Sequence, residues 1–372
     1  MGKRIENHSK RSIDITTVHG KLTIERTLLY ERGTGESVIP KDEYMEISEL
    51  PFKMTKSMMT ETAYYAQNQV SFKSASEMIE RSMGIGVDSE TVRKTAEYVG
   101  GRVHAADIIR ANKAYENIAN IEYSTVHKGT LYIMTDGAMV NTRAEDESGS
   151  TWRENKLALI FTDRDMIKTK GGNNIILKKE YVSYVGSAEK FKKYIFEAAV
   201  RNGYGTFANV VVIGDGATWI RTMCHELFPD ATQILDKYHL CENIYTYAKS
   251  LFNSVASQYT KWAETVIDKV EKGLIDEVFD IIDKSGENPD STFSLATYIQ
   301  NNIDKINYNF YECQGWFVGS GAIESGNKIV LQRRLKQPGM RWNVKTAQSV
   351  VTLRAKAESR LWDSHVVNLI CS

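Results

Sequence analysis

Three aspartates of the sequence come directly after short apolar runs. Asp136 and Asp215 each lie two residues after a run of four apolar residues, and Asp236 directly follows Leu235. A single aspartate in such a place is commonly a turn former or a helix cap. Two carboxylates that meet at one sheet edge repel each other unless a cation lies between them. Mg²⁺ suits such a pair, because it prefers oxygen ligands.

The order of the surrounding elements decides whether these carboxylates meet. Five runs are typical of strands, with a helix expected from Ser187, between the third and the fourth. Three consecutive strands form a meander, and that helix allows a crossover that places the fourth strand beside and parallel to the first. This is the ribonuclease-H-like order, and it brings Asp136 and Asp215 to the edge where open sheets bind ligands. The runs are residues 131–134, 157–161, 181–185, 210–213 and 233–235.

A third carboxylate is then expected from a helix. Glu324 is near the start of the last long helix and follows a glycine-rich approach, Gly319 to Gly321. Two magnesium ions roughly 3.5–4 Å apart can activate an attacking oxygen and stabilise a leaving one in phosphoryl transfer. In the alternative interpretation, Glu324 is only stabilised by the helix dipole or pairs with Lys328 one turn later.

The segments around these carboxylates resemble bacterial insertion-sequence transposases of the ISLre family. That family is related to Mutator-like elements and has an Asp-Asp-Glu catalytic set on a ribonuclease-H-like, retroviral-integrase-like core. The resemblance runs from about Arg11 to the C-terminus, and its four motifs occur in the family's order. They are Thr135-Asp136-Gly137, Ile213-Gly214-Asp215-Gly216-Ala217, Asp236-Lys237-Tyr238-His239 and Gly321-Ala322-Ile323-Glu324-Ser325, the last followed by Arg333-Arg334 and Gly339-Met340-Arg341-Trp342.

The resemblance implies an activity and a set of site residues. Asp136, Asp215 and Glu324 would be the catalytic residues and the ligands of Mg²⁺, with Mn²⁺ as a substitute. The enzyme would hydrolyse the phosphodiester at the element ends, and the freed 3′-hydroxyl would attack target DNA. Asp236 and His239 match an Asp-x-x-His signature and would either support the metal ligands or contact DNA. Alternatives are a ribonuclease-H-like nuclease without strand transfer and a catalytically inactive, truncated DNA-binding copy.

Double-stranded DNA, as terminal inverted repeats and as target, is the expected partner. Bringing two ends together requires a homodimer or a larger assembly, in the bacterial cytoplasm at the nucleoid. Residues 325–360 contain nine basic residues and one acidic residue, which favours phosphate contacts. Trp342 could stack on an unpaired base or belong to the core. The expected DNA-binding residues are Lys328, Arg333, Arg334, Lys336, Arg341 and Trp342.

Outside the catalytic core, the sequence predicts a hairpin at 12–32 with a turn at His19-Gly20. Ser71 can cap a helix that ends near Ser82, and Asp88 or Ser89 can cap a second short helix. This pair matches a helix-turn-helix or an ordinary helical hairpin. The expected domains are an N-terminal β-hairpin segment (1–52), a helical, helix-turn-helix-like DNA-binding region (53–120), the ribonuclease-H-like catalytic core (121–240 and 313–345), an all-helical insertion (241–312) and a C-terminal helix (346–372).

The overall charge hides an uneven distribution. The chain has 372 residues with 47 basic and 47 acidic side chains, and a net charge of zero at first argues against a nucleic-acid partner. Residues 261–312 contain eleven acidic and five basic residues, so an acidic insertion offsets the basic C-terminal region. No apolar stretch has the ~20 residues of a membrane helix, so we expect no membrane association. Zinc is not expected, because Cys224, His225, His239 and Cys241 lack a standard ligand spacing.

Overall fold

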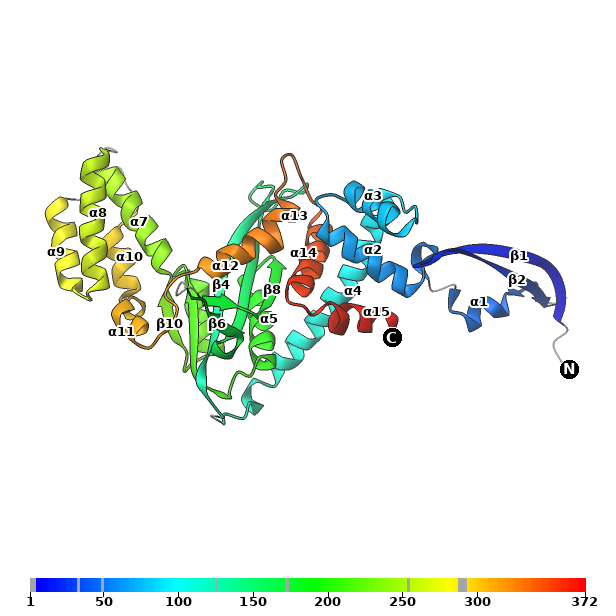
Figure 1. Ribbon diagram of the computed structural model, residues 1–372, viewed down its shortest axis with the longest axis horizontal. Coiled ribbons are helices and arrows are strands. Elements are labelled where there is room, and N and C mark those ends of the chain that lie inside the picture. Colours follow the sequence, from blue (N-terminus) through cyan, green and yellow to red (C-terminus); the bar gives the residue numbers. More distant parts are fainter. Residues whose placement is uncertain are drawn as a thin grey trace. The chain divides into compact units, whose positions relative to one another are not determined.

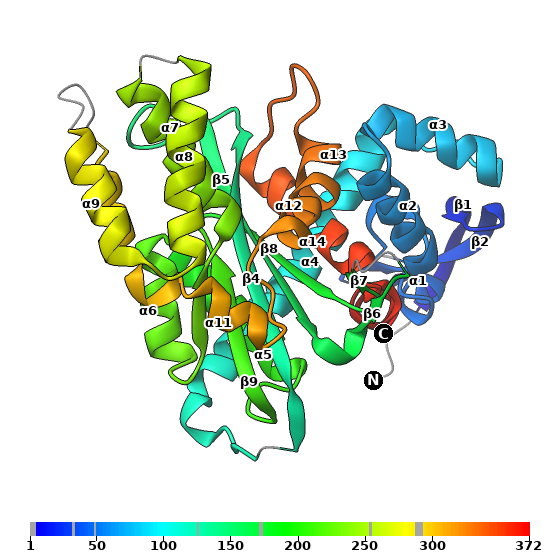
Figure 2. The same ribbon diagram turned by 60° about the vertical axis from the view of Figure 1, so that its left-hand side comes forward.

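The computed structural model describes residues 5–31, 34–47, 50–124, 126–170, 174–252, 255–286 and 293–372. The chain forms two compact units (Figures 1 and 2). We call the first the hairpin-helix unit and the second the sheet unit. The hairpin-helix unit comprises Met1–Asp107, Val140–Trp152 and Val330–Ser372, and the sheet unit comprises Ile108–Met139 and Arg153–Ile329.

A five-stranded mixed sheet in the order β10-β9-β4-β5-β8 forms the centre of the sheet unit. β9 is parallel to both β4 and β10, whereas β8 is antiparallel to β5. The predicted crossover is confirmed, because the fourth predicted strand, β9, pairs in parallel with the first, β4. The strands are β4 (His127–Asn141), β5 (Trp152–Thr162), β8 (Glu180–Val185), β9 (Phe207–Gly214) and β10 (Thr232–Leu235), with a small pair β6 (Met166–Lys168) and β7 (Asn174–Ile176).

The helices of the sheet unit begin with the C-terminal part of α4 (Ser89–Glu116), which continues from the hairpin-helix unit. Of the other helices, one follows β8, one follows β9 and six follow β10 in the described chain. They are α5 (Ala188–Arg201), α6 (Thr218–Leu227), α7 (Lys237–Leu251), α8 (Ala256–Glu271), α9 (Ile275–Ser285), α10 (Leu295–Asn301), α11 (Tyr308–Cys313) and α12 (Gly321–Gly326), with short 3-10 turns η3 (Ile118–Asn120), η4 (Asp163–Asp165) and η5 (Ile303–Lys305). The described part of 241–312 is therefore helical, as predicted.

Alternation along β4 assigns its side chains to two opposite faces of the sheet. Leu131 and Ile133 are fully buried and belong to a core that includes Phe191 of α5 and Met223 of α6. Tyr132 is on the other face, where its ring stacks on the ring of Phe161 with centroids 4.9 Å apart and meets the edge of Phe317. A residue an even number of positions from Tyr132 therefore faces away from α5 and α6.

One strand is longer than the sequence predicts. The run 131–134 was expected to end at Asp136-Gly137, but β4 continues to Asn141 and contains both residues. The strand continues because β5 stays beside it. Just past the end of β4, the Thr142 amide still donates to the Thr151 carbonyl at 2.8 Å.

The hairpin-helix unit starts with the predicted hairpin. β1 pairs antiparallel with β2, and the turn between them spans residues 18 and 19. Ile15 and Ile24 are buried against Ile47, so one face of this hairpin is packed. The elements of the unit are β1 (Ile5–Thr17), β2 (Gly20–Glu31), β3 (Ser37–Val38), α1 (Pro40–Tyr44), η2 (Pro51–Lys53), α2 (Lys56–Asn68), α3 (Phe72–Met83), the first part of α4, α13 (Arg333–Leu335), α14 (Val344–Glu358), η7 (Asp363–Val367) and α15 (Asn368–Cys371).

The predicted caps are confirmed, but one predicted helix length is wrong. The Ser71 hydroxyl accepts the Ser74 amide at the start of α3, and Gly84 ends that helix with φ 70°. Asp88 accepts the Thr91 amide at 3.0 Å at the start of α4. α4 is not short: it extends over 28 residues. Its buried face continues through Val92, Ala96, Val99 and Val103, which keeps the helix packed well past its second turn.

The C-terminal segment 346–372 is not one helix, contrary to the prediction. α14 ends because Arg360 has φ 57°, a left-handed conformation. The Leu361 amide donates to the Lys356 carbonyl at 2.9 Å and the Arg360 amide to the Ala357 carbonyl at 3.0 Å. This is the Schellman pattern that terminates helices. The chain then forms η7 and α15 as separate helical segments.

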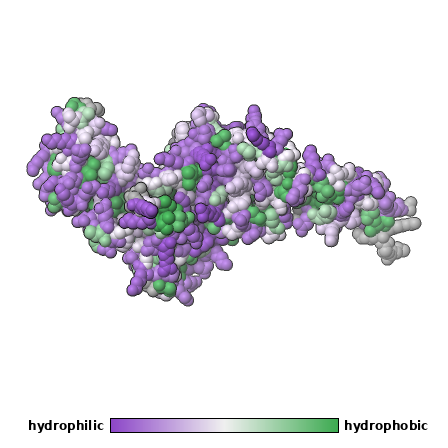
Figure 3. Space-filling view, viewed as in Figure 1, coloured by the Kyte–Doolittle hydropathy of each residue, from purple (hydrophilic) through white to green (hydrophobic). Residues whose placement is uncertain are grey.

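No helix in the described ranges is both long and apolar enough to span a bilayer. On the face shown in Figure 3, hydrophilic residues dominate the surface and apolar residues occur in small groups.

Two adjacent glycines of α4 offer a direct test of helix packing in the hairpin-helix unit. A Cβ atom on Gly100 would lie 2.6 Å from the backbone oxygen of Ser349 in α14, whereas one on Gly101 would have no atom within 4 Å. We expect Gly100→Ala to lower the free energy of unfolding by about 1–3 kcal/mol, because the backbones of two helices must separate. Gly101→Ala should raise it by up to about 1 kcal/mol, since alanine is the better helix former. Urea unfolding measures both, and equal effects of the two substitutions would contradict the close approach.

Candidate active site

Strand register places three aspartates at the same level of the sheet unit. In the parallel pair β4 and β9, Met134 lies opposite Ile213. Asp136 and Asp215 each follow two residues later, so they come opposite each other. In the pair β9 and β10, Leu235 lies opposite Gly214, so the next residue, Asp236, is level with Asp215. The predicted meeting of Asp136 with Asp215 at one sheet edge therefore agrees with the register.

The three carboxyl groups differ in their surroundings. Asp215 is exposed and accepts the Ala217 amide at 2.9 Å. Asp136 is half-buried, and its Oδ2 accepts a hydrogen bond from Asn327 Nδ2 at 2.5 Å. Asp236 is completely buried. The site thus contains one carboxylate open to solvent, one partly shielded and one inside the protein.

Asp136 is the carboxyl group with the clearest electrostatic perturbation in the site. Burial raises its pKa, and the neighbouring Asp215 carboxylate also raises it. Hydrogen bonds from the Gly137 amide and Asn327, together with the nearby His239, lower the pKa but do not cancel the effect of burial. A cation bound between Asp136 and Asp215 would remove this repulsion.

Asp236 anchors the loop that precedes α12. Its Oδ1 accepts the Tyr238 amide at 3.2 Å, which caps α7, and the Ser320 amide at 2.9 Å. The Lys237 amide also donates to the Val318 carbonyl at 2.9 Å. Asp236 therefore ties residues 318–320 to the edge of the sheet. Its Oδ2 lies 3.7 Å from His239 Nε2, as the Asp-x-x-His spacing places them on adjacent turns.

Glu324 is on α12 and bonds to its own helix start. The Ser320 hydroxyl donates to Glu324 Oε1 at 2.8 Å. Asn327, the residue directly after α12, donates to Asp136, so the chain contacts the first aspartate just past the helix that carries Glu324. The helix lies close to the sheet at Gly326, where a Cβ atom would be 2.6 Å from the Tyr181 ring. Gly326 is therefore required by this close approach.

The donor set fits a hard divalent cation at the aspartate pair. Asp136 and Asp215 provide carboxylate oxygens, and two further oxygens nearby, Asp236 Oδ2 and Asn327 Oδ1, are buried without a hydrogen-bond partner in the described structure. Glu324 is not grouped with the pair. Across the residues that the structure describes, no three His, Cys, Asp or Glu side chains are close enough together to hold a metal ion.

Sequence reasoning missed three residues of this site, Ser320, Asn327 and Tyr298. The Tyr298 hydroxyl lies 3.5 Å from the Asp215 carbonyl, and burial raises its pKa to about 12. Ser320 and Asn327 flank Glu324 at helical spacings of four and three residues. That spacing was visible in the sequence, but serine and asparagine near a helix start are ordinary capping residues.

The predicted DNA-binding residues fall into two groups. Lys328, Arg333, Lys336 and Arg341 are exposed, as a phosphate contact requires. Arg334 and Trp342 are 1% and 6% exposed, so neither lies on the open surface of the molecule, and the alternative that Trp342 belongs to the core agrees with its burial. Both belong to the core of the hairpin-helix unit. The indole Nε1 of Trp342 donates to the Leu335 carbonyl at 3.1 Å, and Arg334 donates to the carbonyls of Ala66 and Val70 at 3.1 and 3.2 Å.

Two other residues of the basic segment 325–360 are also buried. Arg354 donates to the Gln67 and Val330 carbonyls at 2.7 and 2.8 Å. Lys356 pairs with Asp107 at 3.0 Å. These side chains hold helices together inside the hairpin-helix unit. The count of nine basic residues therefore overstates the charge that this segment presents to solvent.

Comparison with known protein families shows the family to which the chain belongs. A sequence model of the uncharacterised protein family UPF0236 matches residues 2–355, and the chain therefore belongs to this family. A search of curated proteins finds no match.

Asp136→Asn in metal-free protein should raise the melting temperature by a few degrees at pH 7.5. Burial raises the pKa of Asp136, so the folded state favours the protonated carboxyl, and wild-type stability falls as pH rises through that pKa. Asparagine carries no charge, so the variant does not lose stability as pH rises. Thermal unfolding in EDTA between pH 3 and 8 measures the difference in melting temperature between the variant and the wild type. This difference should disappear in acid.

Asp215→Asn is the matched control, because Asp215 is exposed and its substitution should change stability by less than about 0.5 kcal/mol. Equal stabilisation by both substitutions, or a difference that persists in acid, would contradict the effect of burial at Asp136.

Proposed function

We propose that this protein is a DNA transposase of the Asp-Asp-Glu type with a ribonuclease-H-like core. The observation that carries the proposal is the register of β4 and β9, which sets Asp136 level with Asp215 at one edge of the sheet. The strand order supports it, because a meander of β4, β5 and β8 followed by the parallel strands β9 and β10 is the ribonuclease-H-like arrangement. The ISLre-like motifs of the sequence point to the same class.

Asp136 and Asp215 would hold a magnesium ion, with Glu324 completing the set from α12. The metal would supply charge neutralisation and activation of the attacking oxygen. Asn327 orients the Asp136 carboxylate through its hydrogen bond, and Asp236 fixes the loop from which α12 starts. Water would attack the phosphodiester at the element end, and the P–O3′ bond would break to release the element's 3′-hydroxyl. That hydroxyl would then attack a target phosphodiester and displace the 3′-hydroxyl of the target strand. Both steps are phosphoryl transfers, so one site can perform them in turn.

The exposed basic residues would contact the DNA backbone. Lys328 follows Glu324 by one helical turn, and Arg333, Lys336 and Arg341 are exposed further along the chain. Two element ends must be joined, so we expect a homodimer or larger assembly that acts on DNA at the nucleoid.

A catalytically inactive, DNA-binding copy is the second candidate. The observation that favours it is the bond between Glu324 and Ser320, since the carboxylate is held by its own helix rather than beside Asp136. An inactive copy would bind DNA but would show no metal-dependent chemistry, so activity measurements separate the two candidates.

Asp136→Asn, Asp215→Asn and Glu324→Gln should each lower DNA cleavage and joining by at least about a thousandfold, because each removes a carboxylate from the transition-state site. The substrates are labelled duplexes that carry the DNA flanking the gene, both intact and pre-cleaved at the 3′ end, with Mg²⁺ or Mn²⁺. Gel electrophoresis separates hydrolysed from joined products. Asp230→Asn, an exposed aspartate in the turn before β10, is the matched control and should retain wild-type rates.

The outcomes are distinct. Cleavage without any joined product from pre-cleaved ends would identify a nuclease. DNA binding without metal-dependent cleavage in the wild type would favour the inactive copy. Full activity in Glu324→Gln would remove Glu324 from the catalytic set.

A further inference from the structure

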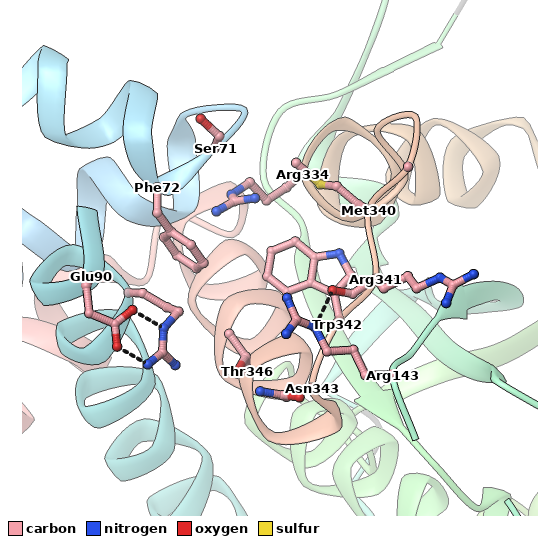
Figure 4. Close-up of a pocket in the computed structure, with 12 residues that line it drawn as sticks. Ser71, Phe72, Glu90, Arg143, Arg334, Met340, Arg341, Trp342, Asn343 and Thr346 are labelled. Carbon is pink, nitrogen blue, oxygen red and sulfur yellow. Dashed lines mark hydrogen bonds and ion pairs between the residues drawn. The ribbon is translucent and has the colours of Figure 1, made fainter. Parts of the chain in front are cut away.

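A cavity of about 600 Å³ lies within the hairpin-helix unit, between the start of α3, α4 and the segment that leads into α14 (Figure 4). Its lining contains four arginines and one glutamate: Arg93, Arg143, Arg334, Arg341 and Glu90. Arg93 is neutralised by ion pairs with Glu90 and Glu97 at 2.6 and 2.5 Å. The lining therefore keeps an excess of positive charge that none of its own carboxylates offsets.

Arg334 is the centre of this cavity wall. Its guanidinium lies between two aromatic rings, 4.5 Å from the Phe72 centroid and 4.9 Å from the Trp342 centroid. Nε and Nη1 donate to the Ala66 and Val70 carbonyls. The third nitrogen, Nη2, is buried and has no hydrogen-bond partner in the described parts of the chain. Burying a cation that has an unpaired donor raises the free energy of the folded state unless an anion pairs with it.

Burial lowers the pKa of Arg334 to about 10, and the nearby Arg354 also lowers it. Arg334 therefore still carries its charge at neutral pH. Neither hydrogen bond that it makes is to a carboxylate, so the positive charge is solvated only by backbone carbonyls and aromatic faces. A positive charge held in this way favours an anion in the cavity beside it.

Two further polar residues face the same space. Arg143 uses Nε to contact the Arg341 carbonyl at 3.4 Å, and Figure 4 shows its guanidinium beneath the Trp342 ring. Asn343 precedes α14, a helix of 15 residues, and its side chain makes no capping hydrogen bond. The amides at the start of α14 add a partial positive charge to the cavity. Phe72 and Met340 supply the apolar part of the lining.

We propose that this cavity binds one unpaired nucleotide of a DNA strand. The phosphate would lie on Arg143 and the start of α14, beside the positive charge of Arg334, and the base would contact Phe72 and Met340. The combination of cationic and aromatic residues favours a nucleotide over a peptide, and the volume lies within the range of small-molecule sites. The choice of DNA rests on the proposed function. The cavity itself is formed without any of the proposed catalytic residues.

Asn343→Asp tests the site without disturbing the helix. Aspartate caps a helix as well as asparagine does, and its negative charge interacts favourably with the helix dipole, so α14 should remain stable. The new charge would repel the phosphate. Val344→Asp is the matched control, because it adds the same charge at the next residue, 37% exposed, and is not part of the cavity lining.

Fluorescence anisotropy in EDTA compares a labelled blunt duplex with the same duplex carrying a three-thymidine 3′ extension. Wild-type protein and Val344→Asp should prefer the extended duplex by about tenfold, and Asn343→Asp should lose that preference. Arg143→Ala should weaken it, whereas Lys345→Ala, which removes an exposed charge of α14 outside the lining, should not.

Equal binding of blunt and extended duplex by the wild type would overturn the proposal, as would equal losses in Asn343→Asp and Val344→Asp. If inorganic phosphate displaces the extension as effectively as thymidine monophosphate does, the cavity is a free-phosphate site and the nucleotide assignment fails. The assay requires no catalysis. A preference for the extension in a protein without cleavage activity would therefore support this site while the proposed transposase activity fails.

Discussion

The parallel pairing of β4 with β9 is the constraint on which the candidate site depends. Register in a sheet fixes both the level of each residue and the face to which it points. Asp136 shares the face of Tyr132, opposite the core beneath α5 and α6, and that is the face on which Asn327 reaches it. A shift of β4 by one residue would turn Asp136 into the apolar core and break its bond to Asn327. The geometry of the site is thus a consequence of strand pairing.

A second constraint comes from the buried carboxyl of Asp236. Its single bonded oxygen accepts two backbone amides, one at the start of α7 and one at Ser320, 84 residues later in the chain. Between these points the chain forms the helices of the insertion. The insertion can therefore be long without moving the start of α12, because both of its ends are held at the same carboxylate. This explains how Ser320, at the start of α12, remains at the sheet edge after so large a departure of the chain.

Local signals in the sequence predicted the elements well, and long-range contacts limited the rest. The hairpin, the caps at Ser71 and Asp88 and the β4–β9 crossover depend on nearby residues or on chain order, and all three are present. The predicted lengths of β4 and α4 were wrong, because continued pairing with β5 extends the strand and a continued buried face extends the helix. The contact between Asn327 and Asp136 spans 191 residues, so no local pattern could reveal it.

Charge counting shows the same limit. A run of basic residues predicts a solvated, DNA-facing surface only if the side chains reach solvent, and periodicity along α14 could not show that this helix is buried nearly all round. Arg334, Arg354 and Lys356 lie inside the hairpin-helix unit, where backbone carbonyls and Asp107 receive their donors. Burying a guanidinium is favourable only when its donors are satisfied. Arg354 bonds four different groups, whereas Arg334 retains a free Nη2 beside a cavity. That difference separates an arginine whose hydrogen bonds complete a core from one that keeps an unpaired donor among the described residues.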